Sequence, residues 1–314
     1  MSSLDISSSN KRNILKNKVG TIVVKILLLL LLIGLAYIVL YPFLFRILSA
    51  FMDTEDLYDP LVNIIPAHWT LKRFAEVFAN SEFLSGMLKT ALYAIGVAVC
   101  STFSAAFVGY GLARFKFKGN GIIFGLVILT MLIPLQTVFL PLYTTFKFFD
   151  IFGIFSLFGS SGLSLVDTPF PMLMLAITCL GFRAGIYVIL MRQYYAGIPK
   201  ELIEAAYVDG SSVMKTFWTI ILPMAKSMLI VVFSLSFAWQ WSDTFYSSIL
   251  NGGTNLLPRI VILMTTYDAA AANAYELSIN ANTAAIVAVI PLLIFYCVLQ
   301  KQIIQGIESS GIVG

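Results

Sequence analysis

Charged residues are scarce in this sequence, and histidine and cysteine are scarcer still. Only 11% of the 314 residues are Asp, Glu, Lys or Arg, whereas soluble domains contain about 25%. The single histidine, His68, cannot build a histidine-based zinc site. The three cysteines, Cys100, Cys179 and Cys297, lie in apolar runs without a CxxC pair. We therefore expect no metal site, and we expect the cysteines to pack as small core residues.

Signatures of nucleotide and nucleic-acid binding are also missing. The sequence contains no GxxxxGK[ST] phosphate loop, so any ATP must be hydrolysed by another chain and no cofactor is expected on this one. The formal net charge is +4, but the basic residues are not clustered with aromatic residues as in a nucleic-acid-binding surface. We therefore expect no nucleic-acid partner.

The sequence is instead rich in apolar residues. They make up 59% of the chain, with a mean hydropathy of +0.90, and this composition favours a protein surrounded by membrane lipid. A helix that crosses about 30 Å of hydrocarbon needs roughly 20 residues. Six stretches qualify, approximately Ile22–Phe45, Thr90–Ala113, Gly121–Phe146, Pro171–Tyr195, Ser227–Ser248 and Thr283–Ile304. We predict an all-α polytopic membrane protein with six transmembrane helices, kinked at Pro134, Pro141 and Pro223.

The first apolar stretch is expected to be a retained span. A polar tail, residues 1–19, precedes it, and no small-residue cleavage site follows it. A cleaved signal peptide is the alternative, but its apolar segment is usually 7–15 residues, shorter than Ile22–Phe45. The predicted organisation is therefore the tail, a six-span domain over residues 20–305 and a carboxyl tail over residues 306–314.

Basic residues predict the orientation of the spans, because cytoplasmic loops carry an excess of Lys and Arg. Thirteen of the 20 Lys and Arg residues fall on one side: Lys11, Arg12, Lys16, Lys18, Lys25, Arg114, Lys116, Lys118, Arg192, Lys200, Lys215, Lys226 and Lys301. The segment from Met52 to Lys89, on the other side, is rich in acidic residues. Both termini are therefore predicted to be cytoplasmic.

The longest predicted cytoplasmic insertion covers residues 196–226. Pro199 suits the first position of a helix and Gly210 the residue after its end, so a short rod is predicted between them. Leu202, Ala205 and Ala206 can share one face of this rod, where small side chains allow another backbone to approach closely. An ordinary amphipathic connector on the membrane surface is the alternative.

A resemblance to a known family favours the first interpretation. EAAYVDG, residues 204–210, followed by Ile220, Leu222 and Pro223, resembles the EAA motif of importer-type ABC permeases. Further matches to their carbohydrate branch, similar to the second membrane subunit of the maltose importer, lie at Tyr110–Phe115, Pro134, Pro141–Tyr143, Ile198–Leu202, Trp241–Asp243, Gln300, Gly306 and Gly311–Gly314. Ser211, Ser227 and Ser242 depart from the family pattern, and Ser242 puts the role of the usual Asn in doubt.

The resemblance implies a type I importer fold and a division of labour. A cytoplasmic coupling helix would carry movement from a dimeric ABC ATPase, which uses ATP and Mg, through Glu204, Ala205, Ala206, Asp209, Gly210, Leu222 and Pro223. The tail residues Gly311, Val313 and Gly314 would contact that ATPase. The other implied partners are a second, homologous permease subunit forming a heterodimer, an extracytoplasmic sugar-binding protein and the lipid of a bacterial inner membrane.

Substrate contacts are expected in the fifth predicted span. Phe233, Trp239, Trp241 and Asp243 are candidates, because aromatic faces stack on sugars and carboxylates accept hydrogen bonds from hydroxyl groups. Trp and Tyr also form interfacial belts, which is the alternative. Arg183 is either an intramembrane functional charge or a side chain that reaches the interface near Asp167.

The outward loop between the last two predicted spans contains AAAANAYELS, with Ala271, Asn273 and Tyr275. By resemblance this loop would enter the cleft of the binding protein; otherwise it only caps the spans. An importer for a non-sugar solute and an ATP-independent secondary transporter are the alternative functions. The secondary transporter would be accompanied by internal repeats or paired buried acids, but the sequence has no convincing repeat and almost no intramembrane acids. A membrane enzyme would need a catalytic cluster, and the six spans have no cluster of His, Asp and Glu.

Overall fold

Helices dominate the part of the chain that the computed structural model describes, which is residues 3–151, 153–159, 162–181, 183–254, 256–266 and 274–311. For residues 3–20, 57, 135, 262–266, 274–278 and 307–311 the description covers the backbone alone. Within these ranges β-structure is limited to two isolated bridges, Met52 with Trp69 and Phe149 with Leu163. The all-α prediction is confirmed. The chain divides into two units, Met1–Glu76 and Val77–Gly314.

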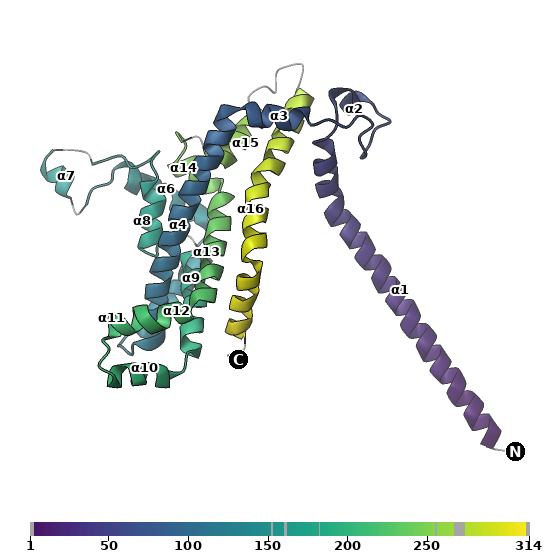
Figure 1. The fold of residues 1–314 in the computed structure, drawn as a ribbon, viewed down its shortest axis with the longest axis horizontal. Coiled ribbons are helices and arrows are strands. Elements are labelled where there is room, and N and C mark those ends of the chain that lie inside the picture. Colours follow the sequence, from purple (N-terminus) through teal and green to yellow (C-terminus); the bar gives the residue numbers. More distant parts are fainter. Residues whose placement is uncertain are drawn as a thin grey trace. The chain divides into compact units, whose positions relative to one another are not determined.

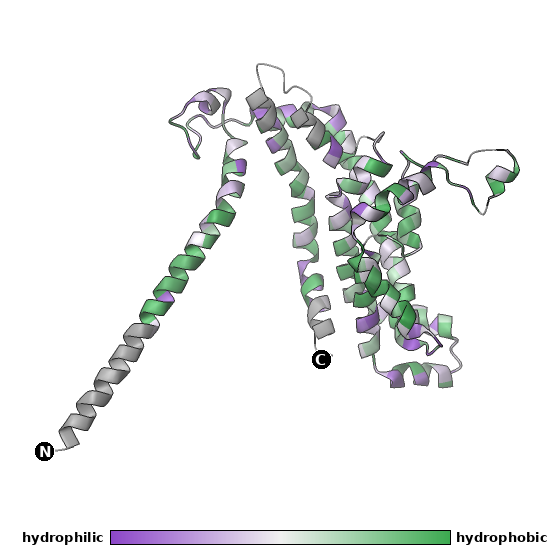
Figure 2. Ribbon diagram, turned by 180° about the vertical axis from the view of Figure 1, so that it is seen from behind, coloured by the Kyte–Doolittle hydropathy of each residue, from purple (hydrophilic) through white to green (hydrophobic). Residues whose placement is uncertain are grey.

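The first unit is built on one long helix, α1 (Ser3–Ser49). Its apolar part, Thr21–Ser49, has a mean hydropathy of 3.0 and no buried residues in its most apolar stretch, and Figure 2 shows mostly hydrophobic residues along it. A helix that is apolar on all sides suits a lipid environment. The first predicted span is therefore confirmed as a helix long enough to cross a membrane.

A buried carboxylate organises the segment after α1, beside the short helix α2 (Thr54–Tyr58). Asp56 accepts a hydrogen bond from the backbone N–H of His68 at 2.8 Å, and the His68 Nδ1 lies 2.7 Å from its other oxygen. Desolvation raises the pKa of Asp56, but the hydrogen bonds from His68 outweigh it and lower that pKa below its usual value. The hydrogen bond with Asp56 raises the pKa of His68. The contact is charge-assisted while His68 is protonated, and it weakens as the pH rises through this raised pKa.

The second unit is a helical bundle around α4 (Ser81–Arg114), which follows α3 (Lys72–Ala79). Asn80 caps α4, since its side-chain oxygen accepts from the N–H groups of Glu82 and Phe83. The helix α4 packs against α8 (Phe170–Ile177), α9 (Ala184–Gly197), α13 (Lys226–Trp241) and α15 (Leu257–Thr266). The last helix, α16 (Ala274–Gly311), packs along α13 (Figure 1).

The third predicted span is interrupted at a proline, and a second bend lies just before the fifth. The stretch Gly121–Phe146 forms α5 (Asn120–Leu132) and α6 (Leu135–Lys147), which bend by 102°. Ile133, before Pro134, is extended as proline requires of its predecessor. A second bend, of 76°, precedes α13, close after Pro223. Pro141 lies inside α6, which continues through it. Bends are thus observed beside Pro134 and Pro223.

The fourth and fifth predicted spans are also divided. The stretch Pro171–Tyr195 contains α8 and α9, separated at residues 178–183, where Cys179 has a φ of 60°. The stretch Ser227–Ser248 contains α13 and then α14 (Phe245–Leu250). Of the described helices, three are long and apolar enough to cross a membrane, or up to five if each bent pair counts as one span. The count of six is therefore not confirmed.

The carboxyl end is more helical than expected. The helix α16 continues through Gly311, into the predicted tail of residues 306–314. At Gly306 a Cβ atom would lie 2.9 Å from the Ser227 carbonyl oxygen, so α16 approaches the start of α13 closely there. Val313 and Gly314 lie outside the described residues. The helix is thus held against α13 near the point where the tail was expected to begin.

The helices α4 and α9 approach each other closely at Gly109. A Cβ atom there would lie 2.7 Å from the Met191 Cβ and 3.0 Å from the Arg192 nitrogen, whereas one at Gly111 would meet nothing within 4 Å. Small residues at such crossings let membrane helices approach.

We expect Gly109→Ala to lower the melting temperature of the detergent-purified protein, because overpacking costs about 1–3 kcal/mol. The control, Gly111→Ala, is expected to leave it unchanged or to raise it slightly, since alanine favours a helix. Equal melting temperatures for the two variants would contradict the close α4–α9 contact.

Candidate functional site

The predicted rod is present as α10 (Lys200–Val208). Pro199 is the residue before the helix, rather than its first residue, and Gly210 follows its end with a φ of 79°. The Gly210 N–H donates to the Tyr207 carbonyl and the Ser211 N–H to the Ala206 carbonyl. This is a Schellman closure, in which glycine adopts the left-handed backbone at little cost. The helix end predicted from Gly210 is confirmed, and the beginning predicted from Pro199 is off by one residue.

The two faces of α10 differ in burial. Ile203 and Ala206 are 8% and 7% exposed. Leu202 and Ala205 are exposed on the other side, and Val208 is 87% exposed. Ala206 lies one turn from both Leu202 and Ile203, but it is buried, so of Leu202, Ala205 and Ala206 only the first two are open to another backbone. Glu204 and Asp209 are exposed as well.

A second short helical run leads from α10 back to the bundle. It consists of α11 (Val213–Thr216), the π-helix η1 (Phe217–Ile221) and α12 (Leu222–Met224). The Ser212 hydroxyl caps α11 by accepting from the Lys215 N–H at 3.3 Å, as expected of a serine near this position. Leu222 packs partly on the core, and Pro223 lies in the first turn of α12. Residues 198–225 are called the α10–α12 element below.

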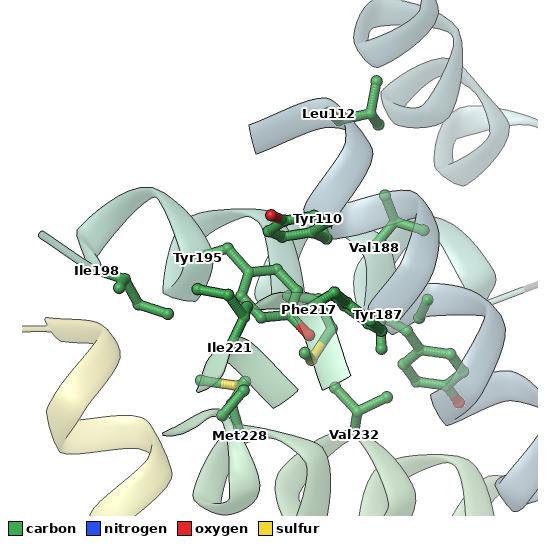
Figure 3. Packing of buried hydrophobic residues seen from close by; sticks show 14 of the residues in the cluster. Tyr110, Leu112, Tyr187, Val188, Tyr195, Ile198, Phe217, Ile221, Met228 and Val232 are labelled. Atoms are coloured by element: carbon green, nitrogen blue, oxygen red, sulfur yellow. The ribbon is translucent and has the colours of Figure 1, made fainter. Parts of the chain in front are cut away.

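One hydrophobic cluster joins this element to the bundle (Figure 3). Ile203 of α10 and Phe217 and Ile221 of η1 are buried in it with Tyr110 of α4 and Tyr195 of α9. The Tyr110 ring centroid lies 5.0 Å from that of Phe217 and 5.6 Å from that of Tyr195. Ile203, on the inner face of α10, therefore belongs to the same buried cluster as residues of α4, α9 and η1.

A cavity of about 250 Å³ lies where the fourth and fifth predicted spans are interrupted. Its polar and aromatic lining includes Ser101, Arg183, Tyr187, Ser236, Trp239, Gln240, Asp243 and Tyr246. The Arg183 guanidinium carbon is 3.0 Å from the centre of the Trp239 ring, a cation–π contact. Gln240 is 6% exposed, and its Nε2 has no hydrogen-bond partner within the described chain. A buried unsatisfied amide is costly unless a ligand or water meets it.

The four substrate candidates are placed differently. Trp239 and Asp243 line the cavity, and the Asp243 carboxylate also accepts from the backbone N–H groups of Tyr246 and Ser247 at the start of α14. The Trp241 Nε1 instead donates to the Ala288 carbonyl of α16 at 3.0 Å. Phe233 packs against Phe237 and Phe295, away from the cavity lining.

Other cavity residues were not candidates at the sequence level. Gln240 is one of the polar residues that interrupt the fifth predicted span, which indicates a face turned toward protein or water, whereas Tyr187 and Tyr246 carry no motif that distinguishes them from core residues. Arg183 stacks on Trp239, whereas Asp167 accepts a hydrogen bond from the Gly253 N–H. The depth of Arg183 in the membrane therefore stays a prediction.

The residues predicted to contact the binding protein and the ATPase lie at the ends of the described ranges or outside them. Ala271 and Asn273 are outside the described residues, as are Val313 and Gly314. Tyr275 belongs to the first turn of α16, and Gly311 is the last residue of that helix. Their roles stay predictions.

The chain is similar to known proteins over most of its length. The family model described as "Binding-protein-dependent transport system inner membrane component" matches residues 101–309. The probable ABC transporter permease protein YurM of Bacillus subtilis is 27% identical over 299 residues, 94% of this chain and 90% of that protein. The arabinooligosaccharides transport system permease protein AraQ of Halalkalibacterium halodurans is 27% identical over 286 residues, 89% and 93% of the two chains.

A solved structure shares the fold. It is a bacterial ABC transporter involved in the import of the acidic polysaccharide alginate, and one of its chains superposes with a TM-score of 0.71 at 20% identity. The match covers 90% of this chain and 97% of that one. The predicted ABC importer permease fold is thereby confirmed.

A substitution at Gly210 tests the closure of α10. A Cβ atom there would meet nothing within 4 Å, so the substitution changes only the energy of the left-handed backbone conformation. We expect Gly210→Val to destabilise the end of α10 by about 1–2 kcal/mol, the approximate cost of a left-handed conformation, and to increase protease cleavage near residue 210. The control, Gly210→Asn, is expected to be tolerated, since asparagine adopts this conformation readily. Identical cleavage of both variants would contradict the Schellman closure.

Proposed function

Because the chain belongs to the family of binding-protein-dependent transport system inner membrane components, we propose that it is one membrane subunit of an ATP-driven importer that brings a carbohydrate into a bacterial cell. The α10 helix carries this proposal. Its inner face is packed into the bundle through Ile203, while Leu202, Ala205 and Val208 form an exposed apolar outer face. Such a patch on a short, capped helix fits a partner protein.

The partner on that outer face is proposed to be a dimeric ABC ATPase, which binds ATP and Mg. Closure of the ATPase would move α10 as a rigid body, and the cluster around Tyr110, Tyr195 and Phe217 would pass the movement to α4, α9 and α13. A homologous second permease subunit and an extracytoplasmic binding protein would complete the importer. Both termini are proposed to be cytoplasmic, on the side of α10.

The substrate class rests on the relatives and on the cavity. The AraQ relative is described as a permease of an arabinooligosaccharide transport system. The cavity combines the Trp239 ring with polar side chains, and this combination suits a sugar. A non-sugar solute is the alternative, and it would leave carbohydrates without effect in the assay below.

The central test is purification of the chain with its partners from native membranes, followed by ATPase measurements with a panel of mono- and oligosaccharides and the binding protein. We expect an ATPase to copurify and one class of sugar to stimulate it. In the same assay Ala205→Trp should reduce stimulation by at least about tenfold, a loss of about 1.4 kcal/mol, because the ring would obstruct the outer face. Ala205→Ser is the matched control and should retain activity. Absence of a copurifying ATPase would refute the proposal.

The cavity gives a separate prediction for the stimulating sugar. Trp239→Ala should lower its uptake into vesicles about two- to tenfold, because aromatic contacts contribute about 0.5–1.5 kcal/mol. Trp239→Phe keeps an aromatic face and should retain most of the uptake. Unchanged uptake in Trp239→Ala would place the sugar path elsewhere.

A further inference from the structure

The α10–α12 element is held at both of its ends by side chains from the bundle. At its beginning, the Arg114 guanidinium, from the last residue of α4, donates to the Ile198 carbonyl. At its end, the Tyr194 hydroxyl of α9 donates to the Met224 carbonyl at 2.6 Å. Tyr194 precedes the element in the chain, and Met224 is next to its last residue. The hydrogen bond from Tyr194 therefore links the segment that enters the element to the segment that leaves it, and this place is called the base of the element.

The Met224 carbonyl lies at the bend between α12 and α13. Met224 is the last residue of α12, and the chain bends by 76° between this helical run and α13. The last carbonyls of a helix lack intrahelical partners and take them from elsewhere. Ala225, at the bend, is fully buried, so the bend itself is packed against the bundle. The Tyr194 hydroxyl supplies a partner from α9 at the point where the element passes into α13.

We propose that Tyr194 is a positioning residue that closes the base of the α10–α12 element, so that α9 and α13 move together when α10 is displaced. This inference rests on the proposed importer function. Without the hydroxyl, the element would remain packed through Ile203, Phe217 and Ile221, but α13 would be able to lag behind α9. ATP hydrolysis would then continue with less transport.

The hydroxyl can be separated from the packing of the ring. Tyr194 is half-buried at the edge of the core cluster, and Tyr194→Phe keeps the ring while removing the donor. Tyr296→Phe is the matched control, because Tyr296 is a 53% exposed tyrosine of α16. The informative quantity is the amount of sugar transported per ATP hydrolysed, measured in proteoliposomes that contain the complete importer, with the sugar that stimulates the wild type.

We expect Tyr194→Phe to lower this ratio about three- to tenfold, in keeping with the loss of one hydrogen bond, while the assembled complex hydrolyses ATP at a rate within about twofold of the wild type. Tyr296→Phe should leave the ratio unchanged. An unchanged ratio in Tyr194→Phe would overturn the inference, and so would a proportional fall of transport and ATPase activity, which indicates a merely structural role. A wild-type chain that assembles with no ATPase would instead refute the proposed function itself.

Discussion

Lipid offers no hydrogen-bond partners to a polypeptide backbone, so every interruption of a membrane helix must be satisfied from within the protein. The end of α8 illustrates this constraint. The Leu175 carbonyl accepts from the N–H groups of Leu180 and Gly181, and the Ser104 hydroxyl of α4 donates to the Ala176 carbonyl at 2.6 Å. The end of α8 is therefore covered in part by the central helix of the bundle, and Gly181 and Arg183 of the interruption line the cavity.

The same constraint applies at two other interruptions in this unit. The Asp243 carboxylate accepts from the first N–H groups of α14, which turns a polar residue of the fifth predicted span into a helix cap. At the bend before α13 the Met224 carbonyl is met by Tyr194. These side chains allow the chain to depart from continuous helices, and the departures form both the cavity and the α10–α12 element.

The sequence was sufficient where a local signal decides the structure. Composition predicts a membrane protein, and Pro199 and Gly210 predict the ends of α10 because each restricts or permits a particular backbone conformation. Hydropathy could not predict that the fourth span divides at residues 178–183, because the interruption depends on covering contacts from distant residues such as Ser104. Gln240 is one of the polar residues that interrupt the fifth predicted span, which indicates a face turned toward protein or water, but hydropathy could not show that this face lines a cavity.

The cavity and the α10–α12 element are connected by two helices that each touch both. The helix α9 begins at Ala184, in the cavity wall, and ends at Gly197, beside the element. The helix α13 begins at Lys226, after the bend, and ends near Gln240 in the same wall. Their 14 and 16 residues correspond to lengths of about 21 and 24 Å at a rise of about 1.5 Å per residue. Under the proposed function, a displacement of α10 would reach Arg183 and Trp239 along both helices at once, and it would change the cavity because their stacked contact joins the cavity ends of α9 and α13.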